Sequence, residues 1–360
     1  MESWESIEKQ LVDVKQNSWT SLLQFYGILR SFFYTAEMLP LSVLQPTYRK
    51  ALRNWKDQDL NRLKQVLNEV WLLIQQDSER VTAGMYPVSV LQPEWNWGHW
   101  SQLIHIWYQG FKSQTPQFER KGKRPMNSND LEALRDIPNY YKHHQQYSNF
   151  RFLDPHSASM YEHQMELLFL GSMDAMRRLL LAPMKRAFRF SEGEGLRFLE
   201  VGSGSGRMTR FIKLSFPKAR IVVLDASPAY LKEAQKNLRE FNRVDFIQGD
   251  ALDLPFKDEQ FDVVYSSFLI HELPLELRRK ALLEFYRVLS KKGWLGIVDL
   301  LQVDDARELN WTLDQTWFAP NQPHLKDYVR NSLSGTFHNL GLEQIGQERG
   351  FLGKVVYGTK

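Results

Sequence analysis

The spacing of apolar residues changes near residue 196 and divides the chain into two parts. In the first part apolar side chains recur every three or four residues, as between Leu60 and Ile74, which is typical of amphipathic helices. In the second part short apolar runs alternate with helical segments of about 10 to 15 residues. The pattern predicts an all-helical N-terminal region followed by an α/β domain.

The second part is predicted to contain a seven-stranded sheet. The expected strands are residues 197–201, 221–225, 244–248, 261–266, 294–300, 343–347 and 354–358. The expected helices are residues 207–216, 228–242, 276–289 and 324–340. Strands separated by helices imply right-handed crossovers and a mostly parallel sheet. The last two strands have only a short link between them, so they are expected to form an antiparallel C-terminal hairpin.

Three sections follow from these patterns. Residues 1–115 are interpreted as a helical domain rich in aromatic side chains, because eight of the eleven tryptophans lie before residue 110. Residues 116–156 are interpreted as a linker and lid candidate, and residues 157–360 as the α/β domain. A long helix is expected to begin near Ser159, which forms a capping box with Glu162, and to end or kink at Pro183.

Composition narrows the classes of protein. The chain has 360 residues and a formal net charge of +4, which is too small for this length to indicate a nucleic-acid or membrane partner. It contains no cysteine, which excludes disulfides, thiolate metal sites and cysteine nucleophiles. The first ten residues lack an apolar run and no stretch is long enough to insert stably into a membrane, so a cytoplasmic protein is expected. The oligomeric state stays open.

One segment carries the strongest chemical signal. In Phe198-Leu-Glu-Val-Gly-Ser-Gly-Ser-Gly-Arg207 an apolar strand runs into three glycines and then into a helix. Ligands of open α/β sheets bind beyond the carboxyl ends of the strands, where this turn lies. A dinucleotide-binding turn has the spacing G-x-G-x-x-G, but Arg207 stands at the place of its third glycine.

Two acidic residues follow later strands. Asp225 closes the second predicted strand, where a carboxylate can accept both hydroxyl protons of a ribose. It could also cap the helix that begins near Pro228, and the two roles are compatible. Asp250 follows the third strand, either as a turn residue or as an acceptor for an adenine amino group. Because the glycine-rich turn and Asp225 follow the first two strands in the same way, we favour the second role.

Residues 196–360 resemble the class I S-adenosylmethionine-dependent methyltransferases, in the small-molecule branch that includes the menaquinone and ubiquinone C-methyltransferases. The resemblance rests on Glu200–Gly206, on Asp225, on Gly249–Phe256, on Phe261–Phe268 and on Arg287–Leu295. It implies a Rossmann-like fold and S-adenosyl-L-methionine as cofactor. The implied cofactor-binding residues are Glu200, Gly202, Gly204, Gly206, Asp225, Ala226, Asp250, Ala251 and Ser267.

The segment after the fourth strand restricts the class of methyl acceptor that we expect. It lacks the Asn/Asp-Pro-Pro-Tyr sequence with which family members hold nucleobase amines, and it has no carboxylate beside Ser267 for Mg²⁺. We therefore expect in-line methyl transfer to oxygen or carbon of a small, apolar or aromatic acceptor, with neither metal nor nucleic acid. His271 is a candidate general base, and its alternative role is to position the cofactor by packing.

Two other classes of function stay open. A protein that binds S-adenosylmethionine without turnover would keep the same glycines and acids. An NAD(P)-dependent oxidoreductase would need a third glycine at the place of Arg207 and a Tyr-x-x-x-Lys pair, and the sequence Tyr230-Leu-Lys does not supply that pair.

Overall fold

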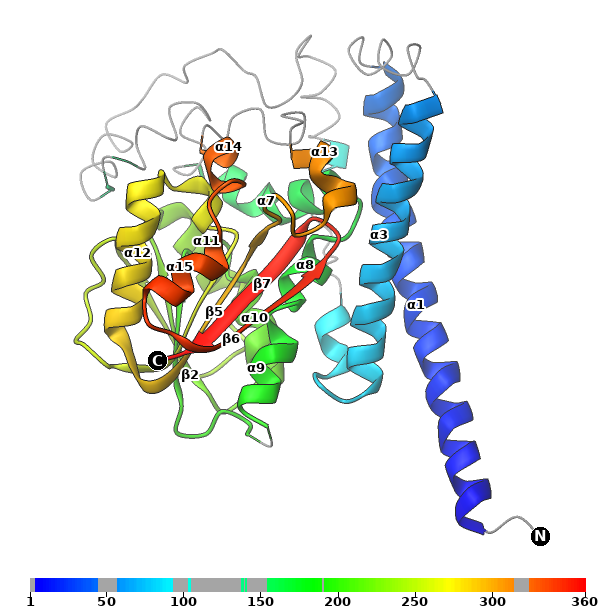
Figure 1. The fold of residues 1–360 in the computed structure, drawn as a ribbon, viewed down its shortest axis with the longest axis horizontal. Coiled ribbons are helices and arrows are strands. Elements are labelled where there is room, and N and C mark those ends of the chain that lie inside the picture. Colours follow the sequence, from blue (N-terminus) through cyan, green and yellow to red (C-terminus); the bar gives the residue numbers. More distant parts are fainter. Residues whose placement is uncertain are drawn as a thin grey trace.

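A computed structural model describes residues 4–44, 57–92, 103–104, 137–138, 140, 154–189, 191–313 and 324–360. A twisted sheet forms the centre of the molecule, with helices on both faces and two long N-terminal helices along one side (Figure 1). The seven strands follow the order β3-β2-β1-β4-β5-β7-β6. Neighbouring strands are parallel except at β7, which is antiparallel to both β5 and β6. The predicted fold class is confirmed.

The strands lie close to the predicted positions. Their bounds are β1 (Arg197–Val201), β2 (Arg220–Asp225), β3 (Val244–Gln248), β4 (Phe261–Ser267), β5 (Leu289–Leu300), β6 (Glu343–Gly350) and β7 (Gly353–Thr359). Apolar side chains of the central strands, such as Leu199, Val223 and Val264, are fully buried. A parallel sheet covered on both faces needs such near-continuous apolar runs, which is why the sequence predicted these strands well.

Three helices of the α/β domain begin within one residue of their predicted starts, although the second ends at Asn237 rather than at residue 242. They are α10 (Arg207–Ser215), α11 (Pro228–Asn237) and α12 (Leu275–Val288). The cap of α11 is Ser227, whose side chain accepts a hydrogen bond from the Tyr230 N–H, and Pro228 occupies the first helical turn. Asp225 therefore does not cap α11 itself, although it accepts a hydrogen bond from the Ser227 N–H.

The single helix predicted from Ser159 is wrong. The segment forms three helices, α7 (Pro155–Leu168), α8 (Met173–Arg178) and α9 (Leu181–Ala187). The N-cap of α7 is Asp154 rather than Ser159, whose hydroxyl donates to the His156 carbonyl. Gly171 has a φ of 74°, and a Cβ there would lie 2.9 Å from the Ser31 Cα, so the break lets a distant segment approach closely.

Pro183 neither ends nor kinks a helix. It lies in the first turn of α9, where a missing N–H leaves no hydrogen bond unmade.

The helix predicted for residues 324–340 is also divided, into α14 (Leu325–Tyr328) and α15 (Leu333–Asn339). The Gln302 side-chain amide donates to the Tyr328 carbonyl at 2.7 Å, next to the break. The break at Gly171 and the break after Tyr328 both involve contacts between residues that are far apart in the chain.

The N-terminal region described here is helical. It contains α1 (Trp4–Leu44), α3 (Asp57–Thr82) and the short 3₁₀ turn η1 (Val88–Leu91). Ion pairs bind α3 to the α/β domain: Asp77 pairs with Arg178 at 2.5 Å and Glu69 pairs with Arg349 at 2.9 Å. Of the predicted linker and lid candidate, only residues 137–138, 140 and 154–156 are described. None of the described helices has an apolar stretch long enough to cross a membrane.

Candidate functional site

The glycine-rich turn joins β1 to α10. Gly202 and Gly206 have φ values of 73° and 81°, which L side chains rarely adopt. A Cβ on Gly202 would lie 2.8 Å from the Leu269 side chain, and one on Gly206 would lie 2.7 Å from the Leu238 side chain. Both positions therefore require glycine, for backbone conformation and for close packing.

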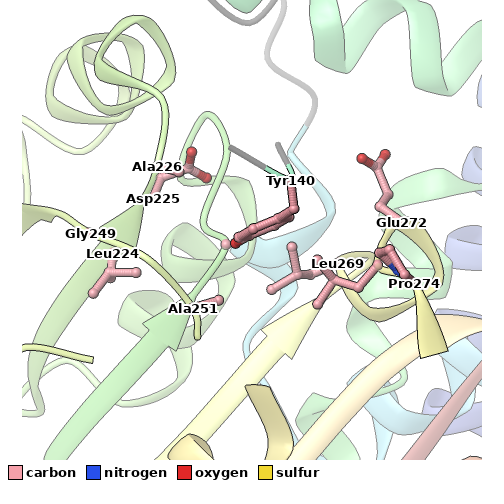
Figure 2. Close-up of a pocket in the computed structure, with 11 residues that line it drawn as sticks. Tyr140, Leu224, Asp225, Ala226, Gly249, Ala251, Leu269, Glu272 and Pro274 are labelled. Atoms are coloured by element: carbon pink, nitrogen blue, oxygen red, sulfur yellow. The ribbon is translucent and has the colours of Figure 1, made fainter. Parts of the chain in front are cut away.

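A cavity of about 530 Å³, partly open to solvent, lies beside this turn at the carboxyl ends of β1 to β4. The strand order reverses between β1 and β4, so the cavity occupies the position where open α/β sheets bind ligands. Its walls come from the turn after each of these strands and from Tyr140 (Figure 2). The lining residues are Tyr140, Gly202, Leu224, Asp225, Ala226, Gly249, Ala251, Leu269, Glu272, Leu273 and Pro274.

Asp225 is held by backbone donors. Its two carboxylate oxygens accept hydrogen bonds from the Gly204 and Ser227 N–H groups, both at 2.8 Å. Burial raises the pKa of Asp225 above its usual value, although these N–H donors oppose the rise. No Lys, Arg or His of the described residues forms a salt bridge with it. A buried carboxylate that faces a cavity without a cation partner is suited to binding a ligand that donates hydrogen bonds.

Tyr140 connects the cavity to Asp250. Its hydroxyl donates to Asp250 Oδ1 at 2.7 Å, and the Leu252 N–H donates to the same oxygen at 2.9 Å. Burial and the neighbouring Asp250 carboxylate raise the pKa of Tyr140, so its hydroxyl keeps its proton at neutral pH. The carboxylate predicted to meet an adenine amino group is therefore already held by a donor that points across the cavity.

The described walls of the cavity carry acidic side chains and no basic one. Asp225 and Glu272 lie on either side of Tyr140 (Figure 2). Burial is the main cause of the raised pKa of Asp225, and the Glu272 charge adds to the rise. Two nearby acids in a partly buried site create a negative potential, which favours a cationic ligand.

The structure brings several of the predicted residues together. Gly202, Asp225, Ala226 and Ala251 line the cavity. Two further predicted residues contact lining residues: the Gly204 N–H donates to Asp225, and Asp250 accepts a hydrogen bond from the Tyr140 hydroxyl. The predicted residues outside the lining are Glu200, Gly204, Gly206, Asp250, Ser267 and His271.

Glu200 is buried in the sheet. It accepts hydrogen bonds from the Thr209 hydroxyl and, at 3.4 Å, from the Tyr265 hydroxyl. These donors meet Oε2, while Oε1 is buried and has no hydrogen-bond partner among the described residues. Burial raises the pKa of Glu200 to about 8, because the two hydroxyl donors compensate only part of the lost hydration.

His271 is buried in the short 3₁₀ helix η3 (Ile270–Glu272) that follows β4. Its Nδ1 lies 2.6 Å from Asp299 Oδ1, and Asp299 Oδ2 accepts the Ile270 N–H at 2.8 Å. Burial alone would lower the pKa of His271, but the Asp299 carboxylate outweighs it and the pKa lies above its usual value. Asp299 thus fixes both the imidazole and the turn that bears Leu269 and Glu272.

Sequence reasoning missed Glu272 and Asp299 and named Tyr140 only as part of a lid. Glu272 had a local signal, because it is an acid in the turn after a predicted strand. Asp299 lies near the end of β5, beside β4, so only the pairing of these strands brings it to His271. No group of three or more His, Asp and Glu side chains within the described ranges is arranged to hold a metal ion.

Comparisons with known proteins agree on one family. Residues 198–293 match a family model described as a methyltransferase domain. The chain is 36% identical over 143 residues to a demethylmenaquinone methyltransferase of Thermotoga maritima, covering 39% of this chain and 57% of that protein. It is 31% identical over 133 residues to a malonyl-(acyl-carrier protein) O-methyltransferase of Xylella fastidiosa, covering 36% and 42%. A solved S-adenosylmethionine-dependent methyltransferase of Aquifex aeolicus has 20% identity and a TM-score of 0.39, covering 57% of this chain and 98% of that chain.

Residues 198–293 therefore carry a methyltransferase domain, in agreement with the resemblance to the class I S-adenosylmethionine-dependent methyltransferases. S-adenosylmethionine is the cofactor of this family. The chain spans only about half the length of the two curated relatives it matches.

Proposed function

We propose that the protein transfers the methyl group of S-adenosylmethionine to an oxygen or carbon atom of a small, apolar or aromatic acceptor. The observation that carries this proposal is the acid-lined cavity beside the glycine-rich turn, whose described walls have no basic side chain. A nicotinamide dinucleotide brings a negative pyrophosphate, which this cavity would repel. The sulfonium and ammonium groups of S-adenosylmethionine are cations, which it would attract.

In this proposal each wall holds one part of the cofactor. Asp225, oriented by the Gly204 N–H, accepts the ribose hydroxyl protons, and Ala226 packs beside it. Asp250 and Ala251 contact the adenine. The turn over Gly202, Gly204 and Gly206, with Glu200 and Ser267, contacts the methionine part. Bound there, the cofactor supplies a methyl group on a good leaving group, so the protein mainly aligns the reactants and excludes water.

The acceptor is proposed to approach from the side of the turn after β4. Leu269, Leu273 and Pro274 give that wall an apolar surface, which suits an apolar or aromatic substrate. The relative named as a demethylmenaquinone methyltransferase supports an acceptor of this kind, and the one named as a malonyl-(acyl-carrier protein) O-methyltransferase supports oxygen as an acceptor atom. His271, oriented by Asp299, is the candidate that accepts a proton from the acceptor or positions the reactants.

Titration calorimetry with S-adenosylmethionine, S-adenosylhomocysteine and NADH tests the cofactor. We expect both adenosyl sulfur compounds to bind and NADH not to bind. Asp225→Asn should weaken their binding by about 100-fold, because a carboxylate contributes roughly 1.5–3 kcal/mol per hydrogen bond. Asp245→Asn is the matched control, since Asp245 is half exposed on β3 and pairs with Arg220. Unchanged affinity in Asp225→Asn would contradict the assignment of the ribose site.

Methyl release against a panel of quinols, phenols and fatty acids tests the reaction. We expect turnover with at least one of these acceptors and none with oligonucleotides. Tight cofactor binding without turnover on any acceptor would support a non-catalytic S-adenosylmethionine-binding protein instead.

A further inference from the structure

Helix α1 has two faces that differ in composition and burial. The buried face includes charged side chains, whereas the exposed face consists of large apolar ones. The stripe that faces the rest of the molecule includes Leu23, Arg30, Tyr34 and Glu37, all buried. The stripe on the opposite side consists of Leu22, Phe25, Leu29 and Phe32, which are 59%, 59%, 50% and 70% exposed. Trp19 and Ile28 flank this exposed stripe and are 46% and 43% exposed. Large apolar side chains gathered on one exposed face mark an interaction surface.

The spacing of the exposed stripe fits another helix. Leu22, Phe25, Leu29 and Phe32 follow one another at intervals of three, four and three residues, which is the period of 3.5 that packs knobs into holes. The buried stripe of the same helix has this spacing where α1 packs on α3: a Cβ on Gly27 would lie 2.5 Å from the Ile74 side chain.

The charge of α1 argues against a membrane surface. Interfacial helices bind anionic lipids through Lys and Arg on their polar face. Helix α1 contains four acidic and three basic residues, namely Glu5, Glu8, Asp13 and Glu37 against Lys9, Lys15 and Arg30. Arg30 is buried in ion pairs with Glu166 and Asp174. The helix has no excess of basic residues with which to attract phosphate headgroups.

We infer that the face formed by Leu22, Phe25, Leu29 and Phe32, with Trp19 and Ile28 beside it, pairs with the same face of a second copy of this chain. Helix α1 lies at the edge of the molecule, and its N-terminal end runs beyond α3 (Figure 1). The exposure of these six side chains leaves the face accessible to a second chain. Six half-exposed large apolar side chains represent on the order of 600 Å² per chain. Two copies would bury roughly 1,200 Å², which reaches the lower limit of specific interfaces.

Analytical ultracentrifugation of the full chain over a range of concentrations tests this pairing. We expect the average mass to rise to twice the chain mass as the concentration increases. Leu29→Glu should raise the dimer dissociation constant by about tenfold or more, because it places a charge in the apolar seam. Leu283→Glu is the matched control, since Leu283 on α12 is 57% exposed and lies outside this face. It should leave the dissociation constant within about twofold of wild type.

Three results would overturn the inference: a monomer at every concentration, a dimer that Leu29→Glu does not weaken, or a monomer that binds phosphatidylglycerol vesicles through this face. Vesicle flotation with the wild type, Leu29→Glu and Leu283→Glu distinguishes the last case. Circular dichroism of each variant checks that the helices still form, so a loss of pairing is not mistaken for unfolding.

Discussion

Two groups of buried carboxylates lie on opposite sides of the glycine-rich turn, and their surroundings differ. On the cavity side, Asp225 is held by backbone N–H groups and its pKa is raised. On the helical side, Asp174 accepts hydrogen bonds from Arg207, at 2.9 Å from Nε, and from Arg30, at 2.7 Å. Burial alone would raise the pKa of Asp174, but Arg207 and Arg30 hold it well below its usual range.

The contrast assigns a different role to each group. Arg30 on α1, Asp174 on α8 and Arg207 at the start of α10 form a continuous buried network, which Glu166 joins through its ion pair with Arg30. This network binds the N-terminal helices to the turn, and in it Asp174 is paired with two arginines. Asp225 has no such cation among the described residues, so its charge is available to a ligand. Burial alone does not identify a functional carboxylate; its partners do.

The largest expected effect separates the two groups directly. Asp174→Asn leaves two buried guanidinium groups without their carboxylate, so it should destabilise the protein by about 3–5 kcal/mol. Asp225→Asn removes a carboxylate with a raised pKa and should change the free energy of unfolding by less than about 1 kcal/mol. Urea unfolding of both variants measures the difference. Equal losses of stability in the two variants would contradict the different roles assigned to Asp174 and Asp225.

Glu200 is a third case, a fully buried carboxylate whose hydrogen-bond donors are two hydroxyl groups. Its pKa rises from 4.5 to about 8 on folding, so the unfolded chain releases this proton at lower pH than the folded one. The unfavourable contribution of Glu200 is therefore absent below about pH 4.5 and grows as the pH rises to about 8. Glu200→Gln should gain roughly 4 kcal/mol over the wild type across this window. Unfolding free energies at several pH values check this gain, and a constant difference would contradict it.

Asp299 represents a carboxylate paired with a histidine at the edge of the site. Asp299→Asn removes the charge that raises the pKa of His271 and leaves burial, which lowers it. If His271 accepts a proton during turnover, the rising limb of the kcat–pH profile should move to lower pH, with kcat reduced by about tenfold. A loss of stability with an unshifted pH profile would show that the pair only holds the turn.

The smallest expected effect concerns Tyr140. Its hydroxyl occupies the Asp250 oxygen that the proposal gives to the adenine amino group. Tyr140→Phe frees this oxygen, so the affinity for S-adenosylmethionine should rise by about threefold to tenfold, the equivalent of one hydrogen bond of roughly 1 kcal/mol. Calorimetry measures the change. Weaker binding would instead mean that Tyr140 stays on Asp250 beside the bound cofactor.

Much of the α/β domain was predictable, because its signals are local. The strands β1 and β3 have the predicted bounds, since buried apolar runs end at glycines and acids. The glycines of the turn, Asp225 and Asp250 were identified because ligands bind at the carboxyl ends of the strands. Glycines there allow the backbone conformations of the turn, and carboxylates there can accept hydrogen bonds. The break between α7 and α8 was not predicted, because it follows from the packing of α1 at Gly171.

Arg207 shows where sequence reasoning stopped. The sequence showed that Arg207 replaces the third glycine of a dinucleotide-binding turn, but it gave no reason for an arginine there. Its partner Asp174 precedes it by 33 residues and lies on another helix. Arg30 approaches the same carboxylate from 144 residues away. Such pairs cannot be found from periodicity or spacing.

The sequence by itself determined the order of strands and helices, the glycine-rich turn and the acids at the strand ends, since these depend on neighbours a few residues away. Only the tertiary structure decided which acids are matched by arginines and which face the cavity. It also decided that His271 meets Asp299 and that α1 keeps an apolar face exposed. The physical reason is that charge pairing and burial depend on distances in space, which the packing of remote segments sets.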